Sequence, residues 1–324
     1  MRNTLIGITR VALAVVATFA MSGAFAQSWP AKPVRIIMPF GPGGGTDIQA
    51  RLLGKHFNES LKQTFIVDNR AGAGGLIGGE LAVQSPPDGY TILFTTASLA
   101  VNVTLYGKRI KFEPLKDLTP VSWISSTPLV LVAHPSVPAK SVKDLVALAK
   151  RTGKMNAGSN GAGTTSHLSV EMLKQMTGIN VAHIPYKGGG PSMVALASGE
   201  TDLLFATGPV AAPQMKAGRV KGLAVTTVKK SSAFPDLPTM NSVYPGFESD
   251  NWYAMFFPAG TSKEIVAKLN SEIAKALKTK DLQEFMAREA LDPVASSPEQ
   301  LQANFKREIE RYAKIIKAGN ITVE

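Results

Sequence analysis

The stretch Pro39-Phe40-Gly41-Pro42-Gly43-Gly44-Gly45-Thr46-Asp47 lies between an apolar run, residues 34–38, and a helix-like segment, residues 48–61. A strand, a glycine-rich turn and a helix therefore follow one another along the chain, which is the building unit of α/β folds. A turn of this kind points backbone N–H groups outward beside the positive end of a helix. We therefore expect an anion to bind at this turn.

A second loop of the same chemistry, Ser159-Asn160-Gly161-Ala162-Gly163-Thr164-Thr165, follows a predicted strand at residues 155–158. In parallel sheets ligands bind at the carboxyl ends of the strands, and both loops lie at such ends. If the two halves of the chain face each other, the loops meet in one cleft. His167, just inside the following helix, is a candidate for ligand contact or, alternatively, for capping and packing.

The first loop does not carry a nucleotide-binding motif. Pro42 and the position of the last glycine do not fit G-x-G-x-x-G, and no Gly-Lys-Ser/Thr follows, so a P-loop is excluded. A tight turn without a ligand remains the alternative. Asp47, at the helix start, can cap the helix, orient waters or hold a ligand amine.

The N-terminus has the pattern of a cleavable export signal. Arg2 and Arg10 supply positive charge, residues 11–20 are apolar, and Ala24-Phe25-Ala26 is a small-x-small cleavage site. We therefore predict a signal peptide at residues 1–26 and a periplasmic mature protein; a membrane anchor is the alternative, but the apolar run is short for a span. The chain has no cysteine, so neither a lipoprotein anchor nor a disulfide is available.

The charge and the length of the chain limit the number of domains and the kinds of partner that we expect. The 324 residues carry a formal net charge of +11, and a chain of this length suggests two domains. Removing Arg2 and Arg10 from the 35 basic residues leaves 33 against 24 acidic ones, or +9. Nucleic acid is not expected as a partner, because the chain is exported and no basic stretch is interleaved with aromatic residues. The positive field suits small anions, whose encounter it would speed, unless it is only a solvated surface.

The hydrophobic pattern predicts two α/β units. In the first half, predicted strands 34–38, 64–67 and 90–95 alternate with helices 48–61 and 76–84. In the second half, predicted strands 129–133, 155–158, 181–184, 202–206 and 222–228 alternate with helices 141–151, 166–176 and 192–198. A strand at 252–257 and helices at 262–277, 281–289 and 298–318 complete the chain and are expected to pack on the first half. Each unit should hold a mainly parallel sheet flanked by helices.

Three further places where a predicted strand ends add candidate residues. In Pro185-Tyr186-Lys187-Gly188-Gly189-Gly190-Pro191, Tyr186 offers an aromatic wall with a hydroxyl group, and Gly188 allows close backbone approach. Thr207, at the end of the next strand, can close the pocket floor, and Ser98 follows the strand at 90–95.

Little in the sequence points to an enzyme or to a cofactor. There is no cysteine nucleophile and no G-x-S-x-G elbow. The four histidines, at positions 56, 134, 167 and 183, lack the spacing of a metal site. We therefore expect neither a catalytic residue nor a bound metal or cofactor.

Several motifs together resemble one family. They are Trp29-Pro30, Ile37-Met38-Pro39-Phe40-Gly41-Pro42-Gly43-Gly44, Asp68-Asn69-Arg70-Ala71-Gly72-Ala73-Gly74-Gly75, Pro87-Asp88-Gly89-Tyr90-Thr91, the second loop with His167, Pro185-Tyr186-Lys187-Gly188 and Phe234-Pro235-Asp236-Leu237-Pro238-Thr239. On these residues the whole mature chain resembles the Bug (TctC-like) family of periplasmic solute-binding proteins, the receptors of tripartite tricarboxylate transporters.

The resemblance implies a two-lobe, type II periplasmic binding protein that closes like a Venus flytrap. Lobe 1 should comprise residues 27–126 and 247–324, and lobe 2 residues 127–246, with the ligand in the cleft between them. The implied ligand is a small carboxylate, either a di- or tricarboxylate, an acidic amino acid or an aromatic carboxylate. The implied partners are the inner-membrane permease subunits of such a transporter, and a monomer is expected. A sensory co-receptor that presents a carboxylate to a signalling protein is the alternative.

The motif loops and the junctions define the predicted ligand-binding set. Its members are Phe40, Gly41, Pro42, Gly43, Gly44, Asp47, Ser98, Ser159, Asn160, Gly161, Ala162, Gly163, Thr164, Thr165, His167, Tyr186, Gly188 and Thr207.

Overall fold

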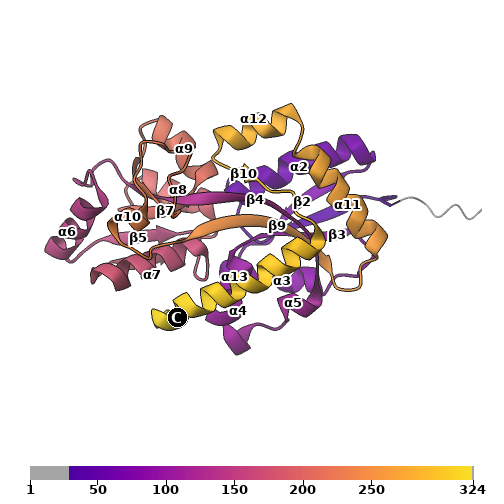
Figure 1. Cartoon of the computed structure of the whole chain (residues 1–324), viewed down its shortest axis with the longest axis horizontal. Coiled ribbons are helices and arrows are strands. Elements are labelled where there is room, and N and C mark those ends of the chain that lie inside the picture. The colour runs from indigo at the N-terminus through magenta and orange to yellow at the C-terminus, as the bar shows by residue number, and fades with distance from the viewer. Residues whose placement is uncertain (1–28, 323–324) are drawn as a thin grey trace, which may run out of the picture.

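Two α/β lobes lie end to end, and the strands β4 and β9 run side by side through the middle of the molecule (Figure 1). The computed structural model describes residues 29–322. The predicted signal peptide, residues 1–26, lies outside the described residues. None of the helices in the described part combines the length and the apolar character that a membrane span requires.

The strands agree closely with the predicted ones in the βαβ units. They are β1 (Val34–Met38), β2 (Phe65–Asn69), β3 (Thr91–Thr96), β4 (Leu118–Ala133), β5 (Asn156–Ser159), β6 (Ala182–Pro185), β7 (Leu203–Thr207), β8 (Lys221–Val225), β9 (Asp250–Pro258) and β10 (Asp292–Pro293).

The helices include several short ones that the sequence pattern did not reveal. They are α2 (Gly45–Leu61), α3 (Leu76–Val83), α4 (Ser98–Leu105), α5 (Pro114–Asp117), α6 (Val142–Thr152), α7 (Thr165–Thr177), α8 (Gly189–Ala197), α9 (Gly208–Lys216), α10 (Met240–Val243), α11 (Lys263–Ala276), α12 (Lys280–Arg288) and α13 (Pro298–Ala318), with 3₁₀ turns at Ala73–Gly75 and Gly107–Arg109.

The pairing of the strands divides the sheet into two parts. In the first part β1 pairs in parallel with β2 and β3, and β9 pairs antiparallel with β3 and with the first part of β4. In the second part β5 lies parallel to β6 and β7, while the end of β4 pairs antiparallel with β7 and β8. The parallel βαβ order is confirmed, and β4 and β9 add antiparallel pairs in the middle of the strand order.

The long strand β4 passes from one part of the sheet to the other. Pro128 pairs with Asp250 of β9, whereas the next residue, Leu129, pairs with Thr207 of β7. The lobe boundaries at 126/127 and 246/247 stay a prediction, because strand pairing alone does not define where one rigid body ends.

The predicted strand at 129–133 was too short, since β4 begins at Leu118. Its first half carries Pro120 and several serines, and its register shifts between Pro120 and Ser122 and between Trp123 and Ser125. These irregularities break the alternation that marks a strand in sequence. Helix α9 was missed for a similar reason: Gly208-Pro209 resembles a turn, although proline is well tolerated in the first turn of a helix.

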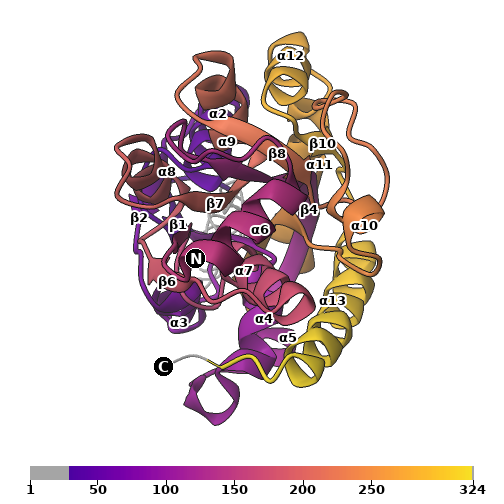
Figure 2. The ribbon, with the colours of Figure 1, turned by 90° about the vertical axis from the view of Figure 1, so that its left-hand side faces the viewer.

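Strand β7 of the second lobe is buried on both faces. Leu203 and Phe205 of β7 belong to the same buried cluster as Leu168 and Leu173 of α7. Leu204 and Ala206 pack in a separate cluster with residues of α8 and α9. Figure 2, which views the molecule from this lobe, shows α7 on one side of β7 and α8 and α9 on the other. Two covered faces explain the continuous apolar runs of the sequence.

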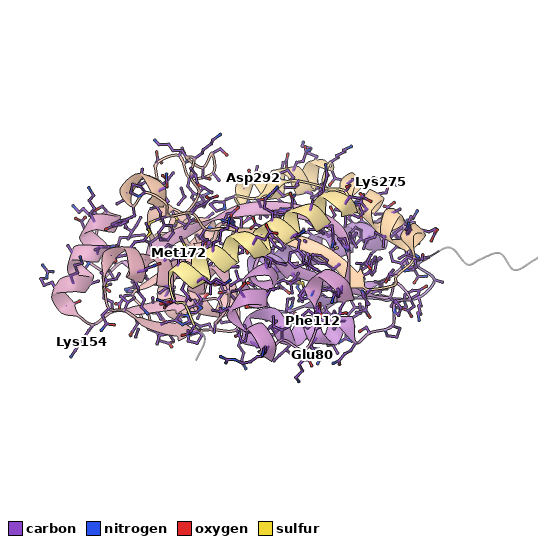
Figure 3. The ribbon with its side chains drawn as sticks, turned by 60° about the horizontal axis from the view of Figure 1, so that its bottom comes forward. Glu80, Phe112, Lys154, Met172, Lys275 and Asp292 are labelled. Atoms are coloured by element: carbon purple, nitrogen blue, oxygen red, sulfur yellow. The ribbon has the colours of Figure 1, made fainter. Side chains whose placement is uncertain are left out.

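The late helices pack on the first lobe, as predicted. Val266 and Leu269 of α11 share a buried cluster with Val34 and Ile36 of β1. Helix α13 begins with a capping box formed by Ser297 and Gln300. It runs across the molecule in Figures 1 and 3 and reaches the second lobe.

Candidate functional site

A cavity between the lobes collects the first residues of several helices. Its lining residues are Phe40, Gly44, Gly45, Thr46, Thr96, Ser98, Asn160, Thr164, Thr165, Gly189, Thr207, Asn251 and Tyr253. Gly45, Ser98, Thr165 and Gly189 are the first residues of α2, α4, α7 and α8, and Thr207 is the N-cap of α9. The space between atoms in this cavity is about 360 Å³ when the open solvent at its mouth is included.

The electrostatics of this cavity favour an anion. Backbone N–H groups in the first turn of a helix have no partner within that helix, and they carry the positive end of its dipole. Here five such helix starts converge from both lobes. The hydroxyl groups of Thr46 and Ser98 add neutral donors, and the Thr96 hydroxyl supports Ser98 by donating to its Oγ at 3.0 Å. No lysine, arginine, aspartate or glutamate belongs to the lining. The site can therefore hold negative charge through neutral donors alone.

The two predicted glycine-rich loops do meet at this cavity. The predicted residues that line it are Phe40, Gly44, Ser98, Asn160, Thr164, Thr165 and Thr207. The predicted residues that lie beside it, outside the lining, are Gly41, Pro42, Gly43, Asp47, Ser159, Gly161, Ala162, Gly163, His167, Tyr186 and Gly188. Whether any of them contacts a ligand stays a prediction.

Asp47 is turned away from the cavity. Its carboxylate accepts hydrogen bonds from the Gly43 N–H at 3.2 Å, from Asn69 Nδ2 at 3.1 Å and from Arg51 at 3.0 Å. Burial alone would raise the pKa of this carboxyl group, but the bonds from Arg51, Gly43 and Asn69 outweigh it and lower the pKa. Asp47 thus stays ionised and braces the first loop, and this placement gives no support to the interpretation that it holds a ligand amine.

His167 lies behind the second loop instead of in the cavity. Its Nδ1 accepts a hydrogen bond from the Gly163 N–H at 3.3 Å, and its ring stacks on His183 with centroids 4.1 Å apart. His183 Nε2 lies 2.6 Å from Ser159 Oγ, which in turn accepts from the Gly161 N–H. The two histidines support the loop from its outer side, which corresponds to the packing alternative.

The segment from Pro185 to Pro191 closes the cleft, but its Tyr186 side chain does not line the cavity. The Tyr186 hydroxyl donates to Glu200 Oε1 at 2.6 Å. The Gly41 N–H of lobe 1 donates to the Lys187 carbonyl of lobe 2 at 2.7 Å. A Cβ atom on Gly188 would lie 3.1 Å from the Gly41 nitrogen. The two lobes are therefore in backbone contact, and the structure is a closed form.

Six lining residues were missed by sequence reasoning: Gly45, Thr46, Thr96, Gly189, Asn251 and Tyr253. Gly45, Thr46 and Gly189 belong to motifs that had been quoted, and Thr96 ends a predicted strand, so the strand-end rule could have found these four. Asn251 and Tyr253 had no such signal. They come from β9, which carries no glycine-rich loop and reaches the cavity only through its pairing with β3 and β4.

Within residues 29–322, no group of three or more histidine, aspartate or glutamate side chains is arranged to hold a metal ion. The donors that the cavity presents suit an anion.

Comparison with known proteins adds an independent observation. The model of the tripartite tricarboxylate transporter family receptor matches residues 49–321. Protein BugT of Bordetella pertussis (strain Tohama I) is 36% identical to this chain, over 94% of this chain and 96% of BugT. The periplasmic binding protein BugD is similar in structure, with a TM-score of 0.88 and 33% identity over 91% of this chain and 100% of BugD. A protein of R. palustris solved with adipate has a TM-score of 0.87 and 34% identity, over 91% of this chain and 99% of that one.

Proposed function

This chain belongs to the tripartite tricarboxylate transporter receptor family, and we propose that it captures a small carboxylate in the periplasm and delivers it to the permease subunits of such a transporter. The family assignment confirms the resemblance to Bug proteins and the two-lobe fold. Its members and structural neighbours are solute-binding proteins and not enzymes, as expected.

The observation that carries the carboxylate proposal is the convergence of five helix starts on a cavity without a charged side chain. A carboxylate accepts hydrogen bonds at two oxygens, and neutral donors can hold it without also attracting counter-charges. A charge-assisted bond contributes roughly 1.5–3 kcal/mol, so four or five supply about 6–15 kcal/mol before the entropy of association and closure is subtracted. Micromolar affinity requires about 8 kcal/mol net, which this donor set can reach.

The adipate complex of the R. palustris protein supports a dicarboxylate as the first ligand to try. The excess of basic residues supports an anion in general, because a positive field raises the rate of encounter. Acidic amino acids and aromatic carboxylates have the same anionic group and belong in the same panel.

The binding step is tested by thermal shift and calorimetry on mature protein that has been unfolded and refolded to remove carried ligand. A panel of mono-, di- and tricarboxylates is paired with the corresponding amides. We expect at least one acid to raise the melting temperature while its amide does not. At a free acid concentration of 100 times Kd, binding raises the free energy of unfolding by about 2.7 kcal/mol. If no acid raises the melting temperature of protein that mass spectrometry shows to be ligand-free, the carboxylate proposal is wrong.

The delivery step is tested separately by uptake of the identified radiolabelled acid into cells with and without the receptor gene. Loss of uptake on deletion is expected for a transport receptor. Unchanged uptake, together with intact binding, contradicts delivery and favours the sensory role.

A further inference from the structure

The hydroxyl group of Tyr253 is buried and makes no hydrogen bond of standard geometry among the described residues, although the polar side chains of Thr207 and Asn251 lie near enough to oppose the rise in its pKa that burial causes. The side chain is 1% exposed, and its Oη finds no donor or acceptor at hydrogen-bonding geometry. Oη lies against the first residue of α2, since a Cβ atom on Gly45 would be only 2.5 Å from it. Both residues line the cavity between the lobes. The only polar atom of the Tyr253 side chain is therefore directed at the candidate ligand site.

We propose that Tyr253 is a ligand-binding residue whose hydroxyl donates a hydrogen bond to the bound carboxylate beside the first turn of α2. This inference rests on the proposed function. A buried donor without a partner costs free energy in the closed form of the protein. Phenylalanine would pack in the same place without that cost. A hydrogen-bond acceptor on the bound ligand would offset this cost, which explains a tyrosine at this position.

The backbone around Tyr253 holds the hydroxyl in place. Tyr253 pairs with Thr96 of β3 on one side and with Ser125 of β4 on the other. Its ring packs on Phe94 with centroids 6.3 Å apart. A residue between two paired strands cannot turn out of the cavity without breaking both ladders, so the donor is preorganised for a ligand.

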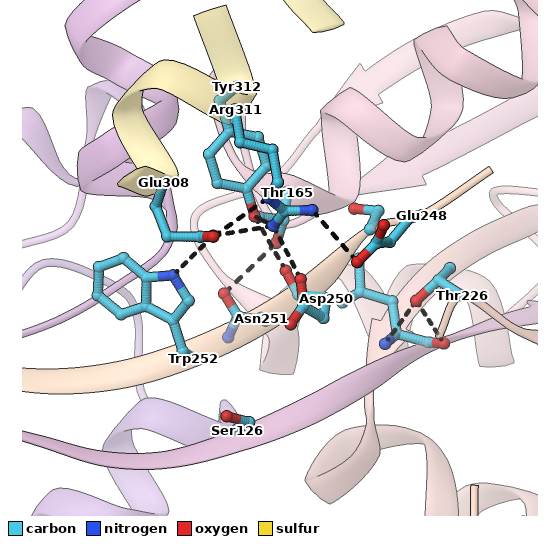
Figure 4. A network of polar contacts seen from close by, with 12 residues as sticks. Ser126, Thr165, Thr226, Glu248, Asp250, Asn251, Trp252, Glu308, Arg311 and Tyr312 are labelled. Carbon is cyan, nitrogen blue, oxygen red and sulfur yellow. Dashed lines mark hydrogen bonds and ion pairs between the residues drawn. The ribbon is translucent and has the colours of Figure 1, made fainter. Parts of the chain in front are cut away.

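Alternation along β9 adds a second restraint (Figure 4). Asn251 and Tyr253 face the cavity, whereas their neighbours bond to helix α13 on the other side. Trp252 Nε1 donates to Glu308 Oε2 at 3.3 Å, and Asp250 accepts from Arg311 at 2.9 Å. A slip of β9 by one residue would exchange the two sets of side chains, and these bonds oppose it.

The chemistry of the phenol suits an anionic acceptor. Burial raises the pKa of Tyr253 to about 12, although the side chains of Thr207 and Asn251 act in the opposite direction. The group therefore stays protonated and remains a donor throughout the range in which carboxylates are ionised. It can therefore donate a hydrogen bond to a carboxylate oxygen.

The test is the affinity of the Tyr253→Phe variant for the acid identified with the wild-type protein. We expect Kd to rise about 10- to 100-fold, the range of one charge-assisted hydrogen bond. The melting temperature of the unliganded variant should equal or exceed that of the wild type, because the lost hydroxyl had no partner. Tyr90→Phe is the matched control: its hydroxyl accepts a hydrogen bond from the Ala31 N–H and does not line the cavity, so its Kd should stay within about twofold.

Equal Kd values for Tyr253→Phe and the wild type would overturn the inference while leaving the proposed function intact. If the wild type binds no acid at all, the proposed function fails first and this inference with it. If Tyr253→Phe does not fold, NMR spectra of the wild-type protein labelled at tyrosine 13Cζ take its place as the test. The Tyr312→Phe variant then identifies the resonance of Tyr312, which is also buried. The Tyr253 resonance, one of six, must shift when the acid is added, and a stationary resonance overturns the inference.

Discussion

The two histidines behind the second loop show how individual residues brace the candidate site. Gly163 donates to His167 and Ser159 bonds His183, so both ends of the loop depend on imidazole groups. Burial lowers the pKa of His167 to about 4, with a further lowering by Lys174. Burial also lowers the pKa of His183 to about 4; His167 and Lys174 lower it further, and Glu171 opposes them. Both rings are therefore neutral at pH 7, and a neutral Nδ1 can accept the Gly163 N–H.

This residue-scale picture predicts a pH dependence of stability. In the unfolded chain each histidine titrates near its ordinary value of 6.5, so below that pH the unfolded state binds more protons than the folded state. The contribution of the pair is fully present above pH 6.5 and is lost as the pH falls toward 4, by up to about 1.4 kcal/mol per pH unit for each histidine. Urea unfolding at pH 7, 6 and 5 measures it.

Between pH 7 and pH 5, the free energy of unfolding of the double variant His167→Gln/His183→Gln should fall less than that of the wild type, whatever its value at pH 7. His134→Gln, which alters a histidine bonded only to neighbouring Ser136, is the control and should keep the wild-type slope. The same slope in all three proteins would contradict the assignment.

At the scale of elements, helix α13 ties the strand that lines the cavity to the rest of the protein. Arg311 contacts Glu308 within its own helix and Asp250 at the start of β9, at 2.8 and 2.9 Å (Figure 4). The end of the same helix meets the second lobe, where Gln175 Nε2 donates to the Ala318 carbonyl at 2.9 Å. The helix therefore spans the region where the lobes join.

Replacing Arg311 with methionine should destabilise the protein by about 2–3 kcal/mol, because the buried carboxylate of Glu308 would lose its cationic partner and keep only the bond from Trp252. This value lies between those for exposed and for fully buried ion pairs. Chemical denaturation measures it. Lys280→Met is the control, since Lys280 and Glu284 form an exposed pair at 3.7 Å and its loss should change stability by less than about 1 kcal/mol. Similar effects of the two substitutions would contradict a special role for Arg311.

At the scale of the whole molecule, the closed form depends on glycines that let the lobes touch. A Cβ atom on Gly190 would lie 2.5 Å from the Pro42 carbonyl oxygen, across the cleft. A second contact lies elsewhere along the cleft, where a Cβ atom on Gly74 would be 2.3 Å from the Ala162 carbonyl oxygen. None of these four residues lines the cavity. We therefore expect these contacts to act on closure.

Gly190→Ala is therefore expected to hinder closure. Gly190 lies in the first turn of α8, where alanine fits the helix, so stability without ligand should be kept or slightly raised. Kd for the bound acid should rise about 5- to 100-fold, because the steric cost falls on the binding-competent state alone. Small-angle scattering should show less compaction on ligand addition than in the wild type.

Gly54→Ala is the control for this prediction, since its Cβ would meet only ordinary contacts, the nearest at 3.7 Å. Gly43 and Gly161 are poorer choices: their φ angles of 77° and 129° mean that a side chain there strains the backbone in the open form as well. Wild-type affinity and compaction in Gly190→Ala would show that closure does not need this contact.

The sequence by itself determined the α/β class, the family and the two glycine-rich loops, because these depend on local chemistry: strand period, turn glycines and helix starts follow from neighbouring residues. Residues 34–38 were predicted as a strand and form one. The tertiary structure alone decided which side chains face the cavity. Asp47 and His167 stand in the right motifs yet point away from it, whereas Asn251 and Tyr253 line it. The physical reason is that the facing of a strand or loop is set by partners distant in sequence: Tyr253 faces the cavity only because β9 pairs with Thr96 and Ser125, more than a hundred residues earlier in the chain.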